Sequence, residues 1–161
     1  MPRKKTRDKG IVITSTEHLM EGLWQLASAP GAPMPDAFRQ GQIDVDGIAF
    51  SLRHGGDDDA DSLYVYCAFG DIPPGRQEAP ALRRLLEINL FLFGDGAPAF
   101  CIDETSNVVV FASRLSTDGL QPQRLVQTLG EIASYARTWR MGYFIEGPAE
   151  PALRAAGSAA R

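Results

Sequence analysis

Cysteine and histidine are scarce in this chain of 161 residues, which contains two of each. A nucleophilic pair would need Cys67 or Cys101 beside His18 or His54, and no motif surrounds either histidine. Glycine-rich nucleotide loops, CxxC pairs, GxSxG and HExxH motifs are also missing. We therefore expect no enzyme, no metal site and no cofactor, and we expect both cysteines to be reduced thiols buried in strands.

Lysine is missing beyond Lys9, and every later cation is an arginine. The folded body therefore has no lysine for a phosphate-binding loop or a Schiff base. Residues 2–9 carry five cations and one anion, so the rest of the chain has a net charge of −8. An acidic body argues against a nucleic-acid-binding domain. The basic arm itself could touch nucleic acid or anionic lipid, or it could be a solvated, disordered terminus.

Long apolar runs are missing as well, since none reaches the roughly 18 residues of a transmembrane helix. The N-terminal residues also lack the apolar stretch and cleavage site of a signal peptide, so we expect a cytoplasmic protein with no membrane span. The length and the 44% apolar content predict a single domain. We place it at residues 13–146, between a basic disordered arm (1–12) and a disordered, alanine-rich tail (147–161).

Hydrophobic periodicity predicts three helices and five strands in the order α-β-β-β-α-β-β-α. Thr14 and Glu17 form a capping box before the first helix, and Pro122 begins the last one. Asp46-Gly47 lies between alternating apolar residues, which is the strongest short signal of a β-hairpin. Strands joined by tight turns, with helices segregated from them, indicate an α+β domain built on an antiparallel sheet.

Two segments are predicted to be loops. Residues 31–40, between the first helix and the hairpin, form a proline-rich loop by this prediction. Residues 54–61 read HGGDDDAD, which predicts a solvated acidic turn. Its aspartates could instead hold a cation, but the alternating spacing and distal glutamate of a calcium loop are missing.

The segment 80–93 is predicted to be a helix with apolar side chains on every side. Such a helix must be covered all round, and a second copy of the same helix is the simplest cover. We therefore expect a homodimer whose interface contains Leu85, Leu86, Asn89, Leu90, Phe91 and Phe93. For the polar residues Glu87 and Asn89 two interpretations remain open: local satisfaction or a rim position, or a polar pin that sets the register of the dimer.

The segment 63–69 is apolar on both faces and is predicted to be a central strand. We assign Leu63, Val65, Cys67 and Phe69 to the core. Tyr64 and Tyr66 carry hydroxyl groups that favour a wet site, so we assign them to an accessible face. A sheet with more apolar surface than three helices can cover is typical of a binding protein.

The stretch LRRLLEINLFLFGDGAPAFCIDETSNVVVFASRL, followed by DGLQPQRLVQTLGEIASYARTWR, resembles the class I chaperones of bacterial type III secretion, the Tir chaperone (CesT) family. It is similar to that family's second helix with its Asn89-Leu90-Phe91 segment, the glycine after it, the strand pair and the final helix ending in Trp139-Arg140. The resemblance covers about residues 14–140. The basic arm, the RHGGDDDADS turn and the alanine-rich tail depart from the family pattern.

The resemblance implies a non-enzymatic homodimer, joined through its second helix, in the cytoplasm of a Gram-negative bacterium. Such chaperones bind N-terminal segments of partly unfolded effectors and deliver them to the secretion ATPase or an export-gate component. Within the family the chain most resembles the broad-specificity chaperones of plant pathogens. We assign effector binding to Leu23, Leu26, Phe50, Tyr64, Tyr66, Val109 and Phe111.

An alternative is a small acidic adaptor or immunity-type protein that binds a folded partner through its acidic face. The two differ in the heat-capacity change on binding, which is large and negative for an unfolded ligand and smaller for a rigid partner with an interface of standard size.

Overall fold

The computed structural model describes residues 15–145. The basic arm, the capping residue Thr14 and the alanine-rich tail lie outside the described residues, as do the predictions made for them. Within the described range the chain is an α+β domain, as the sequence predicts.

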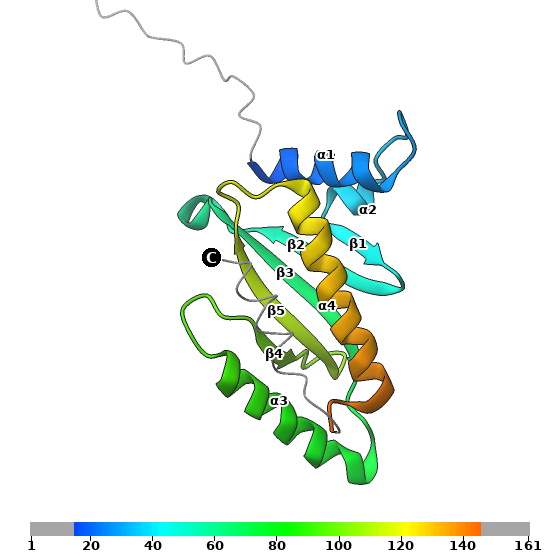
Figure 1. Ribbon diagram of the computed structural model, residues 1–161, viewed down its shortest axis with the longest axis vertical. Coiled ribbons are helices and arrows are strands. Elements are labelled where there is room, and N and C mark those ends of the chain that lie inside the picture. Colours follow the sequence, from blue (N-terminus) through cyan, green and yellow to red (C-terminus); the bar gives the residue numbers. More distant parts are fainter. Residues whose placement is uncertain (1–14, 146–161) are drawn as a thin grey trace, which may run out of the picture.

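Five antiparallel strands form one sheet in the order β1-β2-β3-β5-β4 (Figure 1). The strands are β1 (Gln42–Val45), β2 (Ile48–His54), β3 (Ser62–Asp71), β4 (Ala99–Ile102) and β5 (Val108–Ser116). The hairpin at Asp46-Gly47 is confirmed: both residues have positive φ, and Val45 pairs with Ile48. The predicted central strand β3 is indeed the middle one.

Three long helices match the prediction: α1 (Ser15–Ala27), α3 (Glu78–Leu92) and α4 (Pro122–Gly142). The prediction of a loop at residues 31–40 is wrong for the second half of this segment, because α2 (Asp36–Arg39) forms there. This single turn is held by tertiary packing, since Phe38 makes an edge-to-face contact with Trp24 of α1 at 5.0 Å. Two short 3₁₀ turns also form, η1 (Asp57–Asp59) and η2 (Gly75–Gln77).

The core lies between one face of the sheet and α4, which crosses it (Figure 1). The assignment of β3 is confirmed, because Leu63, Val65, Cys67 and Phe69 are all fully buried. An aromatic cluster extends this core toward the end of α4; its members are Phe69, Phe100, Phe111, Trp139 and Phe144.

Arg140 fastens the end of α4 to the central strand. Its Nε donates to the carbonyl of Phe69 at 2.8 Å, and a terminal nitrogen donates to the carbonyl of Ala68 at 3.2 Å. A β-bulge between Ala68 and Gly70 breaks the regular ladder there. The guanidinium therefore satisfies carbonyl groups where the bulge disturbs the pairing.

The two cysteines have opposite environments. Burial of Cys67 agrees with the prediction and raises the pKa of its thiol to about 12. Cys101 is exposed, so the prediction was wrong for this residue. It points away from the core on the edge strand β4, where a neighbouring strand is present on one side only.

Candidate functional site

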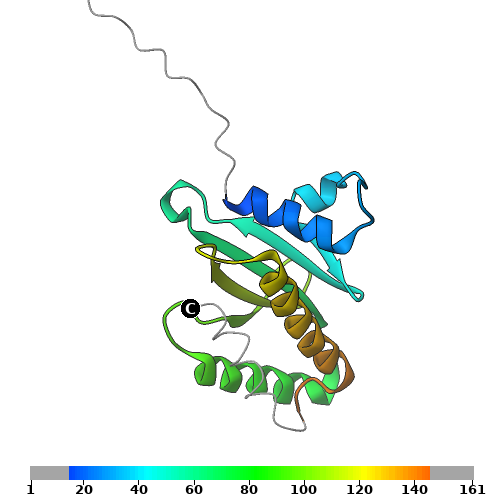
Figure 2. The same cartoon turned by 45° about the horizontal axis from the view of Figure 1, so that its top comes forward.

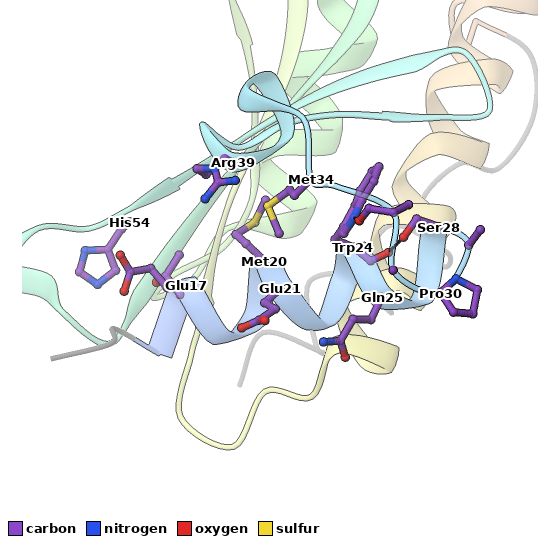
Figure 3. A pocket seen from close by; sticks show the side chains of 14 residues that line it. Glu17, Met20, Glu21, Trp24, Gln25, Ser28, Pro30, Met34, Arg39 and His54 are labelled. Carbon is purple, nitrogen blue, oxygen red and sulfur yellow. Dashed lines mark hydrogen bonds between the residues drawn. The ribbon is translucent and has the colours of Figure 1, made fainter. Parts of the chain in front are cut away.

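A hollow of about 950 Å³ runs along the outer side of α1 (Figure 3). The helix forms one wall, and the segment after it, with Met34 and Arg39, forms the other. His54 and Glu17 lie at one end, and Ser28 and Pro30 lie at the other. We call this feature the α1 groove; its lining residues are Thr16, Glu17, Met20, Glu21, Trp24, Gln25, Ser28 to Ala32, Met34, Arg39 and His54.

The floor of the α1 groove is apolar and its rim is polar. Met20, Trp24 and Met34 supply thioether and aromatic surface, which adapts to varied ligand shapes. The indole Nε1 of Trp24 donates to the carbonyl of Ala32 at 2.8 Å, so it holds the loop against the helix. The groove is therefore suited to a peptide that carries both apolar and polar side chains.

The sequence interpretation missed this groove because its second wall comes from the segment treated as a plain loop. It assigned the first-helix residues Leu23 and Leu26 to effector binding instead. Leu23 is buried in the core, whereas Leu26 is 51% exposed but does not line the groove. One feature of the sequence could have indicated the groove. Met20 and Met34, two adaptable apolar residues, lie on either side of Trp24 and of the turn that follows it.

The face of the sheet opposite the core carries Tyr64 and Tyr66. Tyr66 is 37% exposed and Tyr64 is half-buried. In register beside Tyr66 lie Ser51 on β2 and Ala112 on β5, both small residues. Tyr66 is therefore an exposed aromatic side chain with small side chains on both sides.

Four other residues assigned to effector binding are buried, so the structure contradicts their placement on an accessible surface. Leu23, Phe50, Val109 and Phe111 are each at most 3% exposed. Phe50 and Phe111 both pair with Cys67 across β3. Residues in register share one face of a sheet, so these two lie with Cys67 in the core and opposite Tyr66.

An ionic network occupies one end of the Tyr64–Tyr66 face. Asp59 accepts hydrogen bonds from Ser62 at 2.6 Å and from Tyr64 at 2.7 Å. Its carboxylate also pairs with Arg114 at 2.7 Å. These donors hold the pKa of Asp59 well below its usual value, and the hydrogen bond to Asp59 raises the pKa of Tyr64. Asp59 is thus a structural clamp between the turn and β5, not a solvated member of an acidic turn.

We expect the ion pair and hydrogen bonds of Asp59 to make the stability of the fold depend on pH in the acidic range. Because the pKa of Asp59 is lower in the folded chain than in the unfolded one, its contribution is present above the unfolded value of about 4 and is lost as the pH falls below it. Asp59→Asn should therefore make the melting temperature fall less between pH 5 and pH 3, as followed by circular dichroism. Asp58→Asn, a change at an exposed neighbour in the same turn, should keep the wild-type slope; an equal effect of both changes would contradict the clamp.

A second exposed surface lies on α3, at the β4 end of the sheet (Figure 2). One stripe of this helix, including Leu85 and Ile88, is buried within the same chain. The outer side is exposed: Leu86 by 69%, Leu90 by 78%, Phe91 by 40% and Phe93 by 87%. The prediction for Leu85 was wrong, because this side chain belongs to the chain's own core.

Asn89 is satisfied within the chain. Its side-chain amide donates to the carbonyl of Phe100 at 3.0 Å and accepts from the Phe100 N–H at 2.7 Å. Glu87 pairs with Arg83 and Arg84 on the same helix. Local satisfaction, one of the two interpretations left open by the sequence, therefore holds for both residues. Asn89 thereby occupies the N–H and carbonyl of Phe100 on the outer side of the edge strand β4. Without Asn89, these two groups would be open to another chain.

Comparison with known proteins gives a family and a fold. The model of the Tir chaperone protein (CesT) family matches residues 48–140, more than half of the chain. No curated protein sequence matches the chain. None of the described helices is long and apolar enough to cross a membrane.

Three solved structures have a similar fold at 16% sequence identity. A chain of the ExsC–ExsE complex has a TM-score of 0.58 and covers 80% of this chain and 95% of its own length. A chain of the HopA1–SchA chaperone–effector complex has a TM-score of 0.56, with coverages of 79% and 94%. The structure of the Yersinia pestis type III secretion chaperone SycH with a fragment of YscM2 gives a TM-score of 0.52, with coverages of 75% and 96%. On the sequence match and the fold together, this chain belongs to the Tir chaperone protein (CesT) family.

Proposed function

We propose that this protein is a cytoplasmic chaperone of type III secretion in a Gram-negative bacterium. It binds N-terminal segments of effectors, keeps them partly unfolded and delivers them to the secretion ATPase or an export-gate component. The observation that carries the proposal is the α1 groove, an accessible apolar floor with a polar rim on a chain of a chaperone family. The solved structures of similar fold add support, since SchA is described in a chaperone–effector complex and SycH as a secretion chaperone.

Two further features suit an extended ligand. Strand β1 stands at the edge of the sheet, with β2 as its neighbour on one side. An extended peptide can add to such an edge through backbone hydrogen bonds, which tolerate many sequences. The surface around Tyr66 could then hold alternate side chains and add selectivity. Ordering an unfolded segment is costly, so binding needs a large contact area such as the groove, edge and sheet face together provide.

The proposed active form is a homodimer joined through the exposed side of α3. Large apolar side chains concentrated on one surface are typical of protein–protein contacts. Helix α1, which lines the α1 groove, and α3 lie at opposite ends of the molecule (Figure 1). A dimer joined through α3 would therefore leave both grooves open.

Co-purification tests the proposal most directly. The full chain is isolated from its own cells, and the proteins bound to it are identified. Secreted proteins retained through their N-terminal segments would support chaperone function, and folded partners bound through acidic contacts would favour an adaptor. Calorimetry on the recovered partner separates the same two outcomes, because only coupled folding gives a large negative heat-capacity change.

We expect Tyr66→Ala to weaken binding of the recovered partner by about tenfold, the effect of losing one aromatic contact residue at an interface. The melting temperature should change little, because Tyr66 is exposed and the core is unaltered. Met141→Ala is the matched control, since Met141 is apolar and 80% exposed but lies at the end of α4. If Tyr66→Ala and Met141→Ala bind the partner equally well, the sheet face is not a binding site.

A further inference from the structure

The second wall of the α1 groove is formed by residues 28–35, which read SAPGAPMP and which we call the strap. The strap leaves the end of α1 and leads into the single turn α2. None of residues 24–40 is buried, so no side chain of the strap reaches the core. A segment with so few buried contacts opens locally at a smaller free energy than a buried strand does. This wall is therefore the part of the groove that is free to move.

The prolines of the strap leave it one point at which to bend. Pro30, Pro33 and Pro35 fix their own φ at about −65°, and each residue that precedes a proline is restricted to extended conformations. Within residues 29–35, Gly31 alone escapes both restrictions. Its φ is 79°, and a Cβ added there would meet nothing within 4 Å. Gly31 is therefore the natural hinge between two stiff pieces of chain.

Trp24 of α1 holds the strap and the turn after it. Its carbonyl accepts hydrogen bonds from the N–H and the hydroxyl group of Ser28, at 3.0 and 2.7 Å. Its indole Nε1 donates to the carbonyl of Ala32 at 2.8 Å, and its ring meets Phe38 edge-on with centroids 5.0 Å apart. Ala32 lies directly after the hinge. The indole hydrogen bond therefore fixes the piece of the strap that carries Met34.

Met34 is the side chain that the strap brings to the floor of the groove. Figure 3 shows it beside Met20 of α1. Met20 is buried, whereas Met34 is half-buried and belongs to the mobile wall. A turn of the strap about Gly31 would move Met34 away from α1 and widen the groove. The return movement would place a flexible thioether chain on whatever lies there, and such a chain adapts to varied shapes.

We propose that the strap is a movable wall of the α1 groove, which turns at Gly31 and is held shut by the indole of Trp24. It opens to admit a segment of an effector, and Met34 then closes on that segment. The identity of the ligand rests on the proposed function. The movement itself belongs to the free protein and is tested without a ligand.

Hydrogen exchange of the free, full-length chain, followed by NMR, tests the latch. The Ala32 N–H donates to the carbonyl of Ala29 at 3.1 Å, across Gly31, and this bond breaks when the strap turns. Trp24→Phe keeps an aromatic ring but removes the indole donor. We expect the Ala32 amide to exchange about two- to tenfold faster in this variant, as for the loss of one neutral hydrogen bond. Unchanged exchange of the β3 amides shows that the fold is intact.

Gly31→Ala tests the hinge without touching a side chain of the groove. A positive φ is unfavourable for alanine, so the closed strap should open about five- to thirtyfold more often, after correction for the intrinsic exchange rate beside the new residue. Gly96→Ala is the matched control. Gly96 also has a positive φ of 67° and open space around its Cβ, but it lies between α3 and β4. This change should leave the exchange of Ala32 as in the wild type.

Release of the co-purified partner tests the role of the movement. Trp24→Phe and Gly31→Ala should both speed its dissociation, because Met34 then spends less time on the ligand, whereas Gly96→Ala should not. Unaltered exchange of Ala32 in both strap variants would mean a rigid wall and would overturn the proposal. Faster exchange with an unchanged dissociation rate would also overturn it, since the strap would then have no part in binding. Failure to recover any partner would count against the proposed function alone, and the exchange result would still decide whether the strap moves.

Discussion

Leu90→Asp should convert a dimer of this protein into a folded monomer. Leu90 is 78% exposed in the single chain, so the change leaves the core intact. In the proposed dimer, however, the new carboxylate would be taken out of water among Leu86, Phe91 and Phe93. Burying an unpaired charge is strongly unfavourable, and losing a buried leucine costs about 2 kcal/mol more. We expect the dissociation constant to rise by about a hundredfold or more, as measured by light scattering after size exclusion.

Two further changes make this result specific to the interface. Val126→Asp places a carboxylate at an apolar residue of α4 that is 45% exposed, and it should leave the dimer unchanged. Leu85→Asp, on the buried side of the same helix, should unfold the chain because Leu85 is 4% exposed. A wild-type chain that is monomeric at high micromolar concentration, or a Leu90→Asp variant that remains dimeric, would exclude the exposed side of α3 as the interface.

Phe111→Ala should lower the free energy of unfolding by about 3–5 kcal/mol, the usual cost of removing a buried phenylalanine ring. Phe111 is 1% exposed and lies between Phe69 and Phe100, with ring centroids at 5.6 and 5.0 Å. The cavity cannot close easily, because these neighbours lie on β3 and β4, the two strands that pair with β5 on either side. Urea unfolding at one fixed protein concentration measures the loss and keeps any contribution from dimerisation constant.

Tyr66→Ala is the matched comparison, because Tyr66 lies on the opposite face of the same sheet. It should cost no more than about 1 kcal/mol, as is usual for an accessible residue. A stability loss at Tyr66 equal to that at Phe111 would mean that both faces of the sheet are covered. In that case the face around Tyr66 could not receive cargo.

The separation of the surfaces bears on how the protein would work. Helices α1 and α3 lie at opposite ends of the molecule, and β3, the strand of Tyr66, lies between them (Figure 1). Changes on the exposed side of α3 should therefore alter assembly without altering ligand binding in the α1 groove. Because these sites share no residues, the effects on stability of substitutions at different sites should be nearly additive.

Local chemistry in the sequence was sufficient to predict much of the fold. Asp46-Gly47 determines a tight hairpin because both residues tolerate positive φ. Pro122 marks the start of α4 because its missing N–H is no loss in a first helical turn. The alternation along β3 separated Leu63, Val65, Cys67 and Phe69 from the tyrosines, because successive side chains of a strand point to opposite faces.

Tertiary structure alone decided which apolar residues remain accessible. Phe50 and Phe111 look like surface candidates by composition, but their register with Cys67 places them under α4. Apolar residues occur on every side of segment 80–93, and only its packing against the sheet buries Leu85 and exposes Leu90. The α1 groove depends on the loop that Trp24 ties to its helix, a contact between residues too far apart for any periodic pattern to reveal. The sequence thus determined the helices and strands and which side of each strand faces the core. The accessible surfaces depended on the strand register and on how the helices pack on the sheet, because the exposure of a side chain is a property of the whole packed chain.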